Sequence, residues 1–132
     1  MPPSLELACS VAATQQAVEE FCVELRDWAE VNLDRRHTFA VELLAREALR
    51  NAVVHGCHSD PCKRVRCWLR LKRRLLFIAV ADDGAGFDWR AASQKAPRRV
   101  GTSGRGIQIL RRYATRVRYN TAGNMIAMMR RL

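Results

Sequence analysis

Three polar side chains, Glu47, Asn51 and His55, are spaced four residues apart in an otherwise apolar segment. Each residue of an α-helix turns the chain by about 100°, so a step of four residues drifts by only about 40°. The three side chains therefore share one stripe. A carboxylate can take up a proton, and an amide oxygen can bind a hard cation. The spacing predicts a row of reactive groups, with a merely solvated polar face as the alternative.

A second group of residues directly follows a strand-like apolar run. The run covers Leu75–Ala81, and the segment DDGAGF follows at residues 82–87. The glycines at 84 and 86 allow close backbone approach, and the Asp82 carboxylate can accept a hydrogen bond from an exocyclic amine. A simple Asp-Gly turn is the alternative, but the apolar run before it and the long loop after it argue against a hairpin.

A third group, GTSGRG at residues 101–106, comes just before a helical pattern. Glycines at a helix start expose backbone N–H groups to an anion, and the helix dipole favours negative charge there. The segment is no Walker A loop, because the Gly-Lys-Ser/Thr ending is missing. It also differs in spacing from the dinucleotide fingerprint and has no β-α-β unit around it. A flexible loop before a helix is the alternative.

Periodicity predicts the elements that position these groups. Helices are predicted over residues 12–32, over a second segment ending at Gly56, and over 107–113. Strands are predicted at 4–10, 64–72, 75–81, 115–120 and 124–130. The order β-α-α-β-β-α-β-β, with short turns between adjacent strands, indicates one α+β domain over residues 1–132. Its architecture is a two-layer sandwich: a mostly antiparallel sheet with helices on one face.

The same patterns predict which residues face the core. Residues 64–72 alternate between apolar and basic, so one strand face is buried and the other is wet and basic. The unbroken run Leu75–Ala81 is typical of a central strand covered on both faces. The predicted helical core stripes are Val18, Phe21, Leu25, Trp28 and Val31, and then Phe39, Leu43, Leu44, Ala48, Ala52 and Val53.

Composition and charge exclude several classes of protein. The 132 residues are 48% hydrophobic and 27% charged, which argues against wholesale disorder. No apolar run approaches the ~20 residues of a membrane span, and the N-terminus lacks a signal-peptide pattern, so we expect a cytoplasmic protein. Residues 61–132 carry 18 Lys/Arg and 3 Asp/Glu, a net +15, whereas residues 1–60 carry 5 and 10. The basic half predicts a polyanionic ligand or an acidic partner.

The five cysteines are an odd number. Cys57, Cys62 and Cys67 lie five residues apart beside His55 and His58, a spacing that admits a zinc site. However, no CxxC pair is present, and Cys67 belongs to the apolar side of a predicted strand. Free cysteines in a reducing cytoplasm are the preferred interpretation.

The order and spacing of the three groups resemble the ATP-binding (Bergerat-fold) domain of the GHKL superfamily. The matching pattern is E-x3-N-x3-H on a helix, D-x-G-x-G after a strand and G-x-G at a helix start, over roughly residues 5–132. The segments EALRNAVVHG, IAVADDGAGFD and GRGIQIL, with a strand–Gly–strand ending, are most similar to bacterial anti-sigma factor serine/threonine kinases.

The resemblance implies ATP and Mg²⁺ as cofactors. Glu47 matches the catalytic base that takes the proton from a serine hydroxyl of a protein substrate. Asn51 matches the Mg²⁺ ligand. His55 matches a position near the phosphates or at the helix end.

The resemblance also implies how the base is bound. Asp82 matches the residue that binds the adenine amino group, and Gly84 and Gly86 would let the chain pass under the base. In the family, the turn near the C-terminal end of the domain often carries Gly-Thr, and the threonine hydroxyl helps to bind adenine. Here Gly123-Asn124 replaces it, so Asn124 is the candidate polar group.

Residues 88–103 match the ATP lid of the family. Gly104, Arg105 and Gly106 match the end of the lid, where backbone amides would meet the phosphates. Arg105 would add charge-assisted hydrogen bonds to phosphate oxygens, with Arg98 and Arg99 joining on lid closure.

The implied function is that of an ATP-dependent serine/threonine kinase in a partner switch. Its partners would be a sigma factor or similar regulator, an antagonist of the anti-anti-sigma type as substrate, and a second copy bound through the N-terminal strand and helix. A nucleotide-dependent binding module without kinase activity is one alternative. A basic nucleic-acid-binding protein is another, motivated by the basic strand face of residues 64–72 around Trp68. Once the phosphates are accounted for, the remaining basic surface predicts an acidic protein partner; no direct nucleic-acid or membrane partner is expected.

Overall fold

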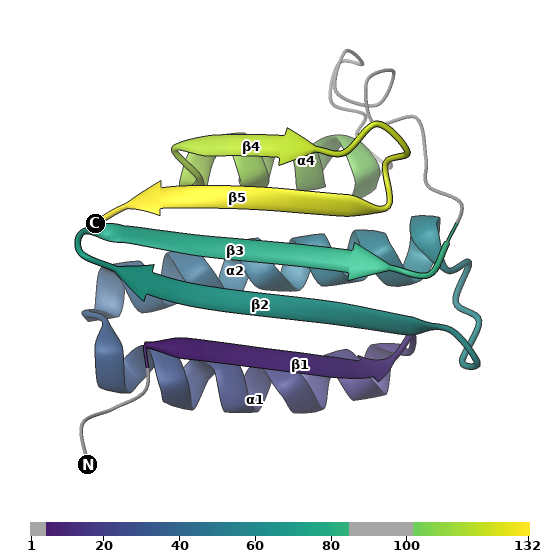
Figure 1. Cartoon of the computed structure of the whole chain (residues 1–132), viewed down its shortest axis with the longest axis horizontal. Coiled ribbons are helices and arrows are strands. Elements are labelled where there is room, and N and C mark those ends of the chain that lie inside the picture. Colours follow the sequence, from purple (N-terminus) through teal and green to yellow (C-terminus); the bar gives the residue numbers. More distant parts are fainter. Residues whose placement is uncertain (1–4, 85–101) are drawn as a thin grey trace.

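A computed structural model describes residues 5–84 and 102–132, the side chains of residues 102–105 and 107 excepted (Figure 1). The predicted element order is confirmed, and the second helix continues directly into a short π-helix, η1. The elements are β1 (Glu6–Ala12), α1 (Gln15–Asn32), α2 (Arg35–Asn51), η1 (Ala52–Gly56), β2 (Arg64–Lys72), β3 (Leu75–Asp82), α4 (Thr102–Tyr113), β4 (Arg116–Tyr119) and β5 (Met125–Arg131).

The strands form one antiparallel sheet in the order β1-β2-β3-β5-β4. Helices α1, α2 and α4 lie side by side on one face of this sheet (Figure 1), which confirms the predicted two-layer α+β sandwich. Because β5 lies between β3 and β4, the β4–β5 turn comes next to the end of β3. The backbone N–H of Asp82 accordingly donates to the carbonyl of Asn124 at 3.0 Å.

Helices α1 and α2 begin at side-chain caps. Thr14 and Asp34 each accept a hydrogen bond from the backbone N–H three residues on, at 3.1 and 2.8 Å. Two predicted core residues are wrong: Val31 is 65% exposed and Phe39 is 59% exposed. Val31 lies about 120° around the helix from the centre of the buried stripe. Phe39 instead packs edge-on against Tyr113 of α4.

The sheet is covered on one face only among the described residues. Side chains alternate between buried and exposed along β2, as predicted. The prediction that β3 is covered on both faces is wrong. Ile78 and Val80 are buried beneath the helices, whereas Phe77 on the opposite face is 38% exposed. An apolar strand face is therefore left without a covering layer in this part of the chain.

The cysteines are dispersed through the fold. Cys57 and Cys67 are buried in the core, and Cys62 is exposed. Burial raises the pKa of the Cys57 and Cys67 thiols, which disfavours the thiolate that binds metals. Within residues 5–84 and 102–132, no three His, Cys, Asp or Glu side chains are grouped to hold a metal ion. No helix of the same described part has the length and apolar character needed to cross a membrane.

Candidate functional site

The carboxyl group of Asp82 is buried at the end of β3, with 7% of the residue exposed. Its Oδ1 accepts a hydrogen bond from the backbone N–H of Gly84 at 2.7 Å. Burial raises the pKa of the Asp82 carboxyl, and the hydrogen bond from Gly84 partly opposes that shift. A carboxylate held in this way costs folding energy, so its position needs a reason other than stability.

Two glycines allow Asp82 to lie this deep. A Cβ added at Gly56, the last residue of η1, would lie 2.4 Å from Cγ of Asp82. A Cβ added at Gly84 would lie 1.8 Å from the backbone oxygen of Gly56. Neither position has room for a side chain. The close backbone approach predicted at Gly84 is therefore present, and it is made to the end of the second helix.

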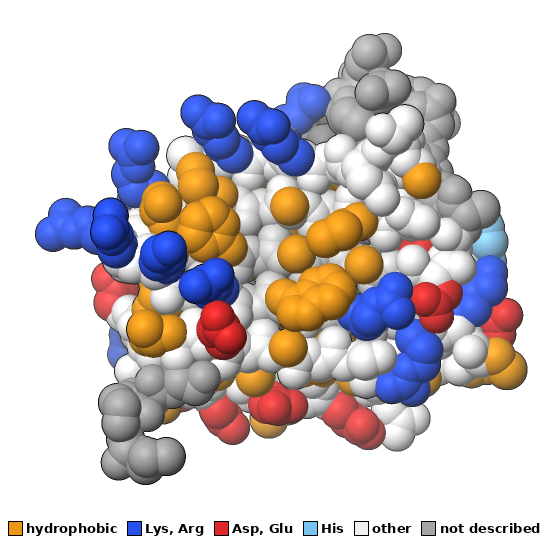
Figure 2. Space-filling model, in the orientation of Figure 1, with side chains coloured by type: hydrophobic (Ala, Val, Ile, Leu, Met, Phe, Trp, Pro, Cys, Tyr) orange, Lys and Arg blue, Asp and Glu red, His pale blue; other side chains and the backbone are white. Residues whose placement is uncertain are grey.

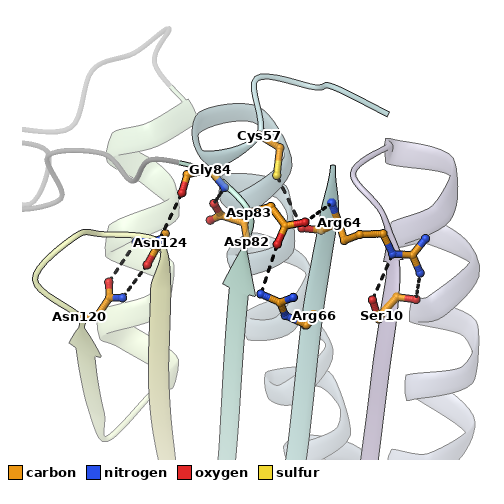
Figure 3. Close-up of polar contacts among 9 residues, drawn as sticks. All are labelled: Ser10, Cys57, Arg64, Arg66, Asp82, Asp83, Gly84, Asn120 and Asn124. Carbon is orange, nitrogen blue, oxygen red and sulfur yellow. Dashed lines mark hydrogen bonds and ion pairs between the residues drawn. The ribbon is translucent and has the colours of Figure 1, made fainter. Parts of the chain in front are cut away.

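The neighbouring carboxylate points elsewhere (Figure 3). Asp83 accepts a hydrogen bond from the backbone N–H of Arg64 at 3.0 Å and forms an ion pair with Arg66 at 3.4 Å. Two adjacent acids thus have separate surroundings: Asp83 pairs with β2 on the exposed side of the sheet, and Asp82 faces the helices.

Asp82 lines a pocket between α2 and the sheet. The pocket is open to solvent on one side, its volume with that open space included is about 270 Å³, and its walls are mostly apolar. Tyr119 is one of the residues that line the pocket, and burial raises its pKa to about 12. An apolar slot with a single carboxylate and a few amides suits a heteroaromatic ring that carries an amine. The lining residues are Ala48, Asn51, Ala52, Val80, Asp82, Tyr119, Gly123, Asn124, Met125 and Ile126.

Asn124 joins the β4–β5 turn to the segment after β3 (Figure 3). Its Nδ2 donates to the carbonyl of Gly84 at 3.2 Å, and its Oδ1 accepts from Nδ2 of Asn120 at 2.6 Å. Gly123, in the same turn, has a φ of 79°, a conformation that favours glycine. Both polar groups of the Asn124 amide are thus engaged within the protein, where they hold one wall of the pocket.

The predicted stripe on the second helix meets the third helix. A Cβ added at Gly106 of α4 would lie 3.0 Å from Oε2 of Glu47 and 3.5 Å from Nδ2 of Asn51. Two motifs separated by about 55 residues of sequence are therefore in contact, and Asn51 also lines the pocket of Asp82. On its other side Glu47 lines a groove between α1 and α2, whose volume with the open solvent at its mouth included is about 640 Å³.

The structure limits three of the other predictions. The α-helical stripe ends at Asn51, because His55 lies in η1, where the wider π-turn changes the rotation per residue. His55 is half-buried and does not line the pocket of Asp82. Helix α4 begins at Thr102 rather than at residue 107, so Gly104 and Arg105 belong to its first turn. Gly86 and the predicted lid, with Arg98 and Arg99, lie outside the described residues, apart from the start of α4.

Three residues of the site have no role in the sequence prediction. The sequence pattern predicts Gly56 only as the end of a helix, and Tyr119 and Asn120 only as parts of a strand. A glycine directly after the E-x3-N-x3-H pattern is the one signal that could have indicated Gly56. The roles of Tyr119 and Asn120 depend on the strand order, which brings the β4–β5 turn beside β3.

Comparison with known proteins shows the family and the fold of the chain. The sequence profile of the histidine kinase-like ATPase domain matches residues 11–130. No curated protein matches the sequence. A crystal structure of the RsbU and RsbW domains of Rv1364c from Mycobacterium tuberculosis matches with a TM-score of 0.64 and 18% identity, over 97% of this chain and 31% of that chain. At this identity the match shows a shared fold. Because the profile spans almost the whole sequence, the chain belongs to the family of histidine kinase-like ATPase domains.

Proposed function

We propose that the protein binds Mg-ATP and phosphorylates a serine or threonine of an antagonist protein, within a partner switch that controls a sigma factor or similar regulator. Three motifs support the proposal by their similarity to anti-sigma factor kinases, as does the shared fold with a chain that contains an RsbW domain. We expect it to act in the cytoplasm.

The observation that carries the proposal is the contact of Gly106 with Glu47 and Asn51. It joins the start of one helix, whose backbone N–H groups favour phosphate, to a carboxylate and an amide on another. The same Asn51 borders the pocket of Asp82, so base and phosphate sites would be continuous.

The residues present fit a nucleotide. The Asp82 carboxylate would accept a hydrogen bond from the exocyclic amine of adenine, and the apolar walls of the pocket would contact the ring. The Asn51 side-chain oxygen would ligate Mg²⁺, a hard cation that prefers oxygen. The bound Mg-ATP supplies the transferable phosphoryl group.

Glu47 is the group we assign to proton transfer. It lies between Gly106 and the groove that separates α1 from α2, so an acceptor side chain could reach it from outside the nucleotide pocket. The acceptor oxygen forms a bond to the γ-phosphorus, the bond from that phosphorus to the β–γ bridging oxygen breaks, and the hydroxyl proton passes to Glu47. The products are a phosphorylated protein and ADP.

The test uses radiolabelled ATP and candidate antagonist proteins. Glu47→Gln is expected to lower phosphoryl transfer by about 10²- to 10⁴-fold, the usual contribution of a general base, while ATP still binds. Glu30→Gln, an exposed acid on α1, serves as the matched control and should retain full activity. Transfer by Glu47→Gln at the normal rate would exclude this role.

A binding module without kinase activity is the second candidate function. It is favoured if ATP increases affinity for a partner while neither wild type nor Glu47→Gln transfers label. The predicted homodimer stays a prediction. Within the described part of the chain, edge strand β1 pairs only with β2. The other edge of β1 is therefore available to a second copy of the protein.

A further inference from the structure

The face of the sheet opposite the helices, which we call the open face, carries groups of exposed apolar side chains (Figure 2). Trp68 on β2 is 41% exposed and Phe77 on β3 is 38% exposed. Figure 2 shows apolar side chains gathered over the central strands and Lys and Arg side chains toward the periphery. Exposed patches of this kind on otherwise well-packed domains mark interaction sites.

Strand register places the apolar residues of the patch in neighbouring rows. Trp68 is paired with Ala79, and Ala79 with Ala127, in one row across β2, β3 and β5. The next row pairs Phe77 with Met129. Small alanines beside large Trp, Phe and Met side chains form a shallow relief in the middle of the sheet. Trp, Phe and Met are also the residues enriched at protein interfaces.

The sequence of β3 itself indicates a covered face. Leu75–Ala81 has no polar residue on either side, a pattern typical of strands buried on both faces. The helices cover only one of them (Figure 1). A solvent-facing strand would ordinarily alternate apolar and polar residues, as β2 does. The missing alternation points to a layer that is supplied from outside the described chain.

The rim of the open face is strongly basic. Of the residues that the structure describes, seven Lys or Arg side chains lie on it, against the two carboxylates of Glu6 and Asp83. Those two carboxylates pair with Arg70 and Arg66. Among the described residues, the other rim cations form no ion pair with a carboxylate. The seven are Arg64, Arg66, Arg70, Lys72, Arg116, Arg118 and Arg131.

We propose that the open face binds an acidic protein partner through an apolar stripe flanked by carboxylates. The apolar patch around Trp68 would form the dry centre of the interface, and the basic rim would pair with the acids of the partner. A second copy bound face to face would bring two basic rims together, which is unfavourable. A nucleic acid would stack a base on Trp68 but would leave the aliphatic side chains beside it, Ala79 and Ala127, without a matching surface. The surface is separate from the groove of Glu47, so the proposal does not depend on phosphoryl transfer.

Two labelled peptides test the chemistry directly. Each is an amphipathic helix of about 18 residues, long enough to fold on binding, with leucines at i, i+3, i+4 and i+7. In one the remaining positions are Glu, and in the other they are Lys. Fluorescence anisotropy should show that the Glu peptide binds wild type, that salt weakens the complex, and that the Lys peptide binds at least about tenfold more weakly.

Variants locate the contact. Two variants should each weaken the binding of the Glu peptide by about tenfold or more: Trp68→Ala, and the double variant Arg116→Glu with Arg118→Glu. Val31→Ala, which removes an exposed apolar side chain from α1, should not. All these side chains are exposed, so circular dichroism should report an unchanged fold.

Three results would overturn the proposal. The first is that the Glu peptide binds no better than the Lys peptide. The second is that a labelled single-stranded DNA binds more tightly than the Glu peptide and loses that binding in Trp68→Ala. The third is that wild type sediments as a dimer which Trp68→Ala makes monomeric, because a second copy would then occupy the face. A dimer that persists in Trp68→Ala supports the proposal, since the open face then remains available.

Discussion

Replacing Asp82 by asparagine is expected to reverse the nucleotide preference of the pocket, from ATP to ITP. In the wild type, Oδ1 of Asp82 accepts the N–H of Gly84 at 2.7 Å. The asparagine oxygen must keep that bond, because turning the amide would place two donors against each other. The amide NH₂ group therefore replaces the second carboxylate oxygen, and a donor then faces the amine of adenine.

The magnitude follows from the lost charge-assisted hydrogen bond. Such bonds are worth about 1.5–3 kcal/mol, and about 1.4 kcal/mol is tenfold in affinity. ATP should therefore bind Asp82→Asn about 10- to 150-fold more weakly than wild type. ITP carries a carbonyl in place of the amine and can accept from the new NH₂ group. Wild type should prefer ATP, and the variant should prefer ITP.

Isothermal titration with both nucleotides measures these affinities. Asp83→Asn is the matched control, because it removes the same charge one residue away, where the carboxylate accepts a hydrogen bond from the backbone N–H of Arg64 and forms an ion pair with Arg66. It should change ATP affinity by no more than a few-fold, as for exposed ion pairs. If Asp82→Asn binds ATP as tightly as wild type and gains nothing for ITP, the assignment of the pocket to adenine is refuted.

Asp82→Asn should also be more stable than wild type at neutral pH. Burial raises the pKa of Asp82 in the folded protein, so folding favours the protonated form. The contribution of this group is present below the unfolded pKa and is lost as the pH rises through the folded pKa. Asparagine has no charge to bury. The stability difference between variant and wild type, measured by thermal unfolding, should therefore grow from about pH 4 upward.

Two further predictions concern the walls of the pocket. Gly84→Ala should destabilise the fold by about 1–3 kcal/mol or more, because its Cβ would lie 1.8 Å from the backbone oxygen of Gly56; a Tm equal to wild type would contradict this packing. Burial raises the pKa of Tyr119 to about 12, so wild type should lose stability as the pH rises from about 10 toward 12. Tyr119→Phe should lack that part of the loss in denaturant unfolding at pH 9 and 11, and equal losses would contradict it.

Local patterns carried most of the fold prediction. The helical stripe through Leu25 and the alternation along β2 depend only on residues a few positions apart, so the sequence predicts both directly. The start of α4 could not be predicted, because glycine costs about 1 kcal/mol in a helix and the apolar pattern begins only at Ile107. The exposed face of β3 could not be predicted either. An apolar strand sequence indicates that both faces are suited to burial, but it does not show whether this chain or a partner covers them.

The site was predictable as types of residue and not as contacts. Spacing indicated Glu47 and Asn51, and the position directly after the apolar run Leu75–Ala81 indicated Asp82. The contact of Gly106 with the stripe of the second helix needs the packing of α4 on α2, which no local pattern contains. The close approach of Gly56 and Gly84 follows from the packing of η1 against the end of β3. The position of Tyr119 follows from the strand order, in which β5 lies between β3 and β4.

The most direct test of the account is a calorimetric titration with ATP, with and without Mg²⁺, on wild type and Asn51→Ala. The account predicts that wild type binds ATP and that Mg²⁺ tightens the complex. It predicts that Asn51→Ala keeps the binding seen without Mg²⁺ and loses the gain that Mg²⁺ brings, because the ligand oxygen is gone. Absence of ATP binding to folded wild type under both conditions would contradict the central claim.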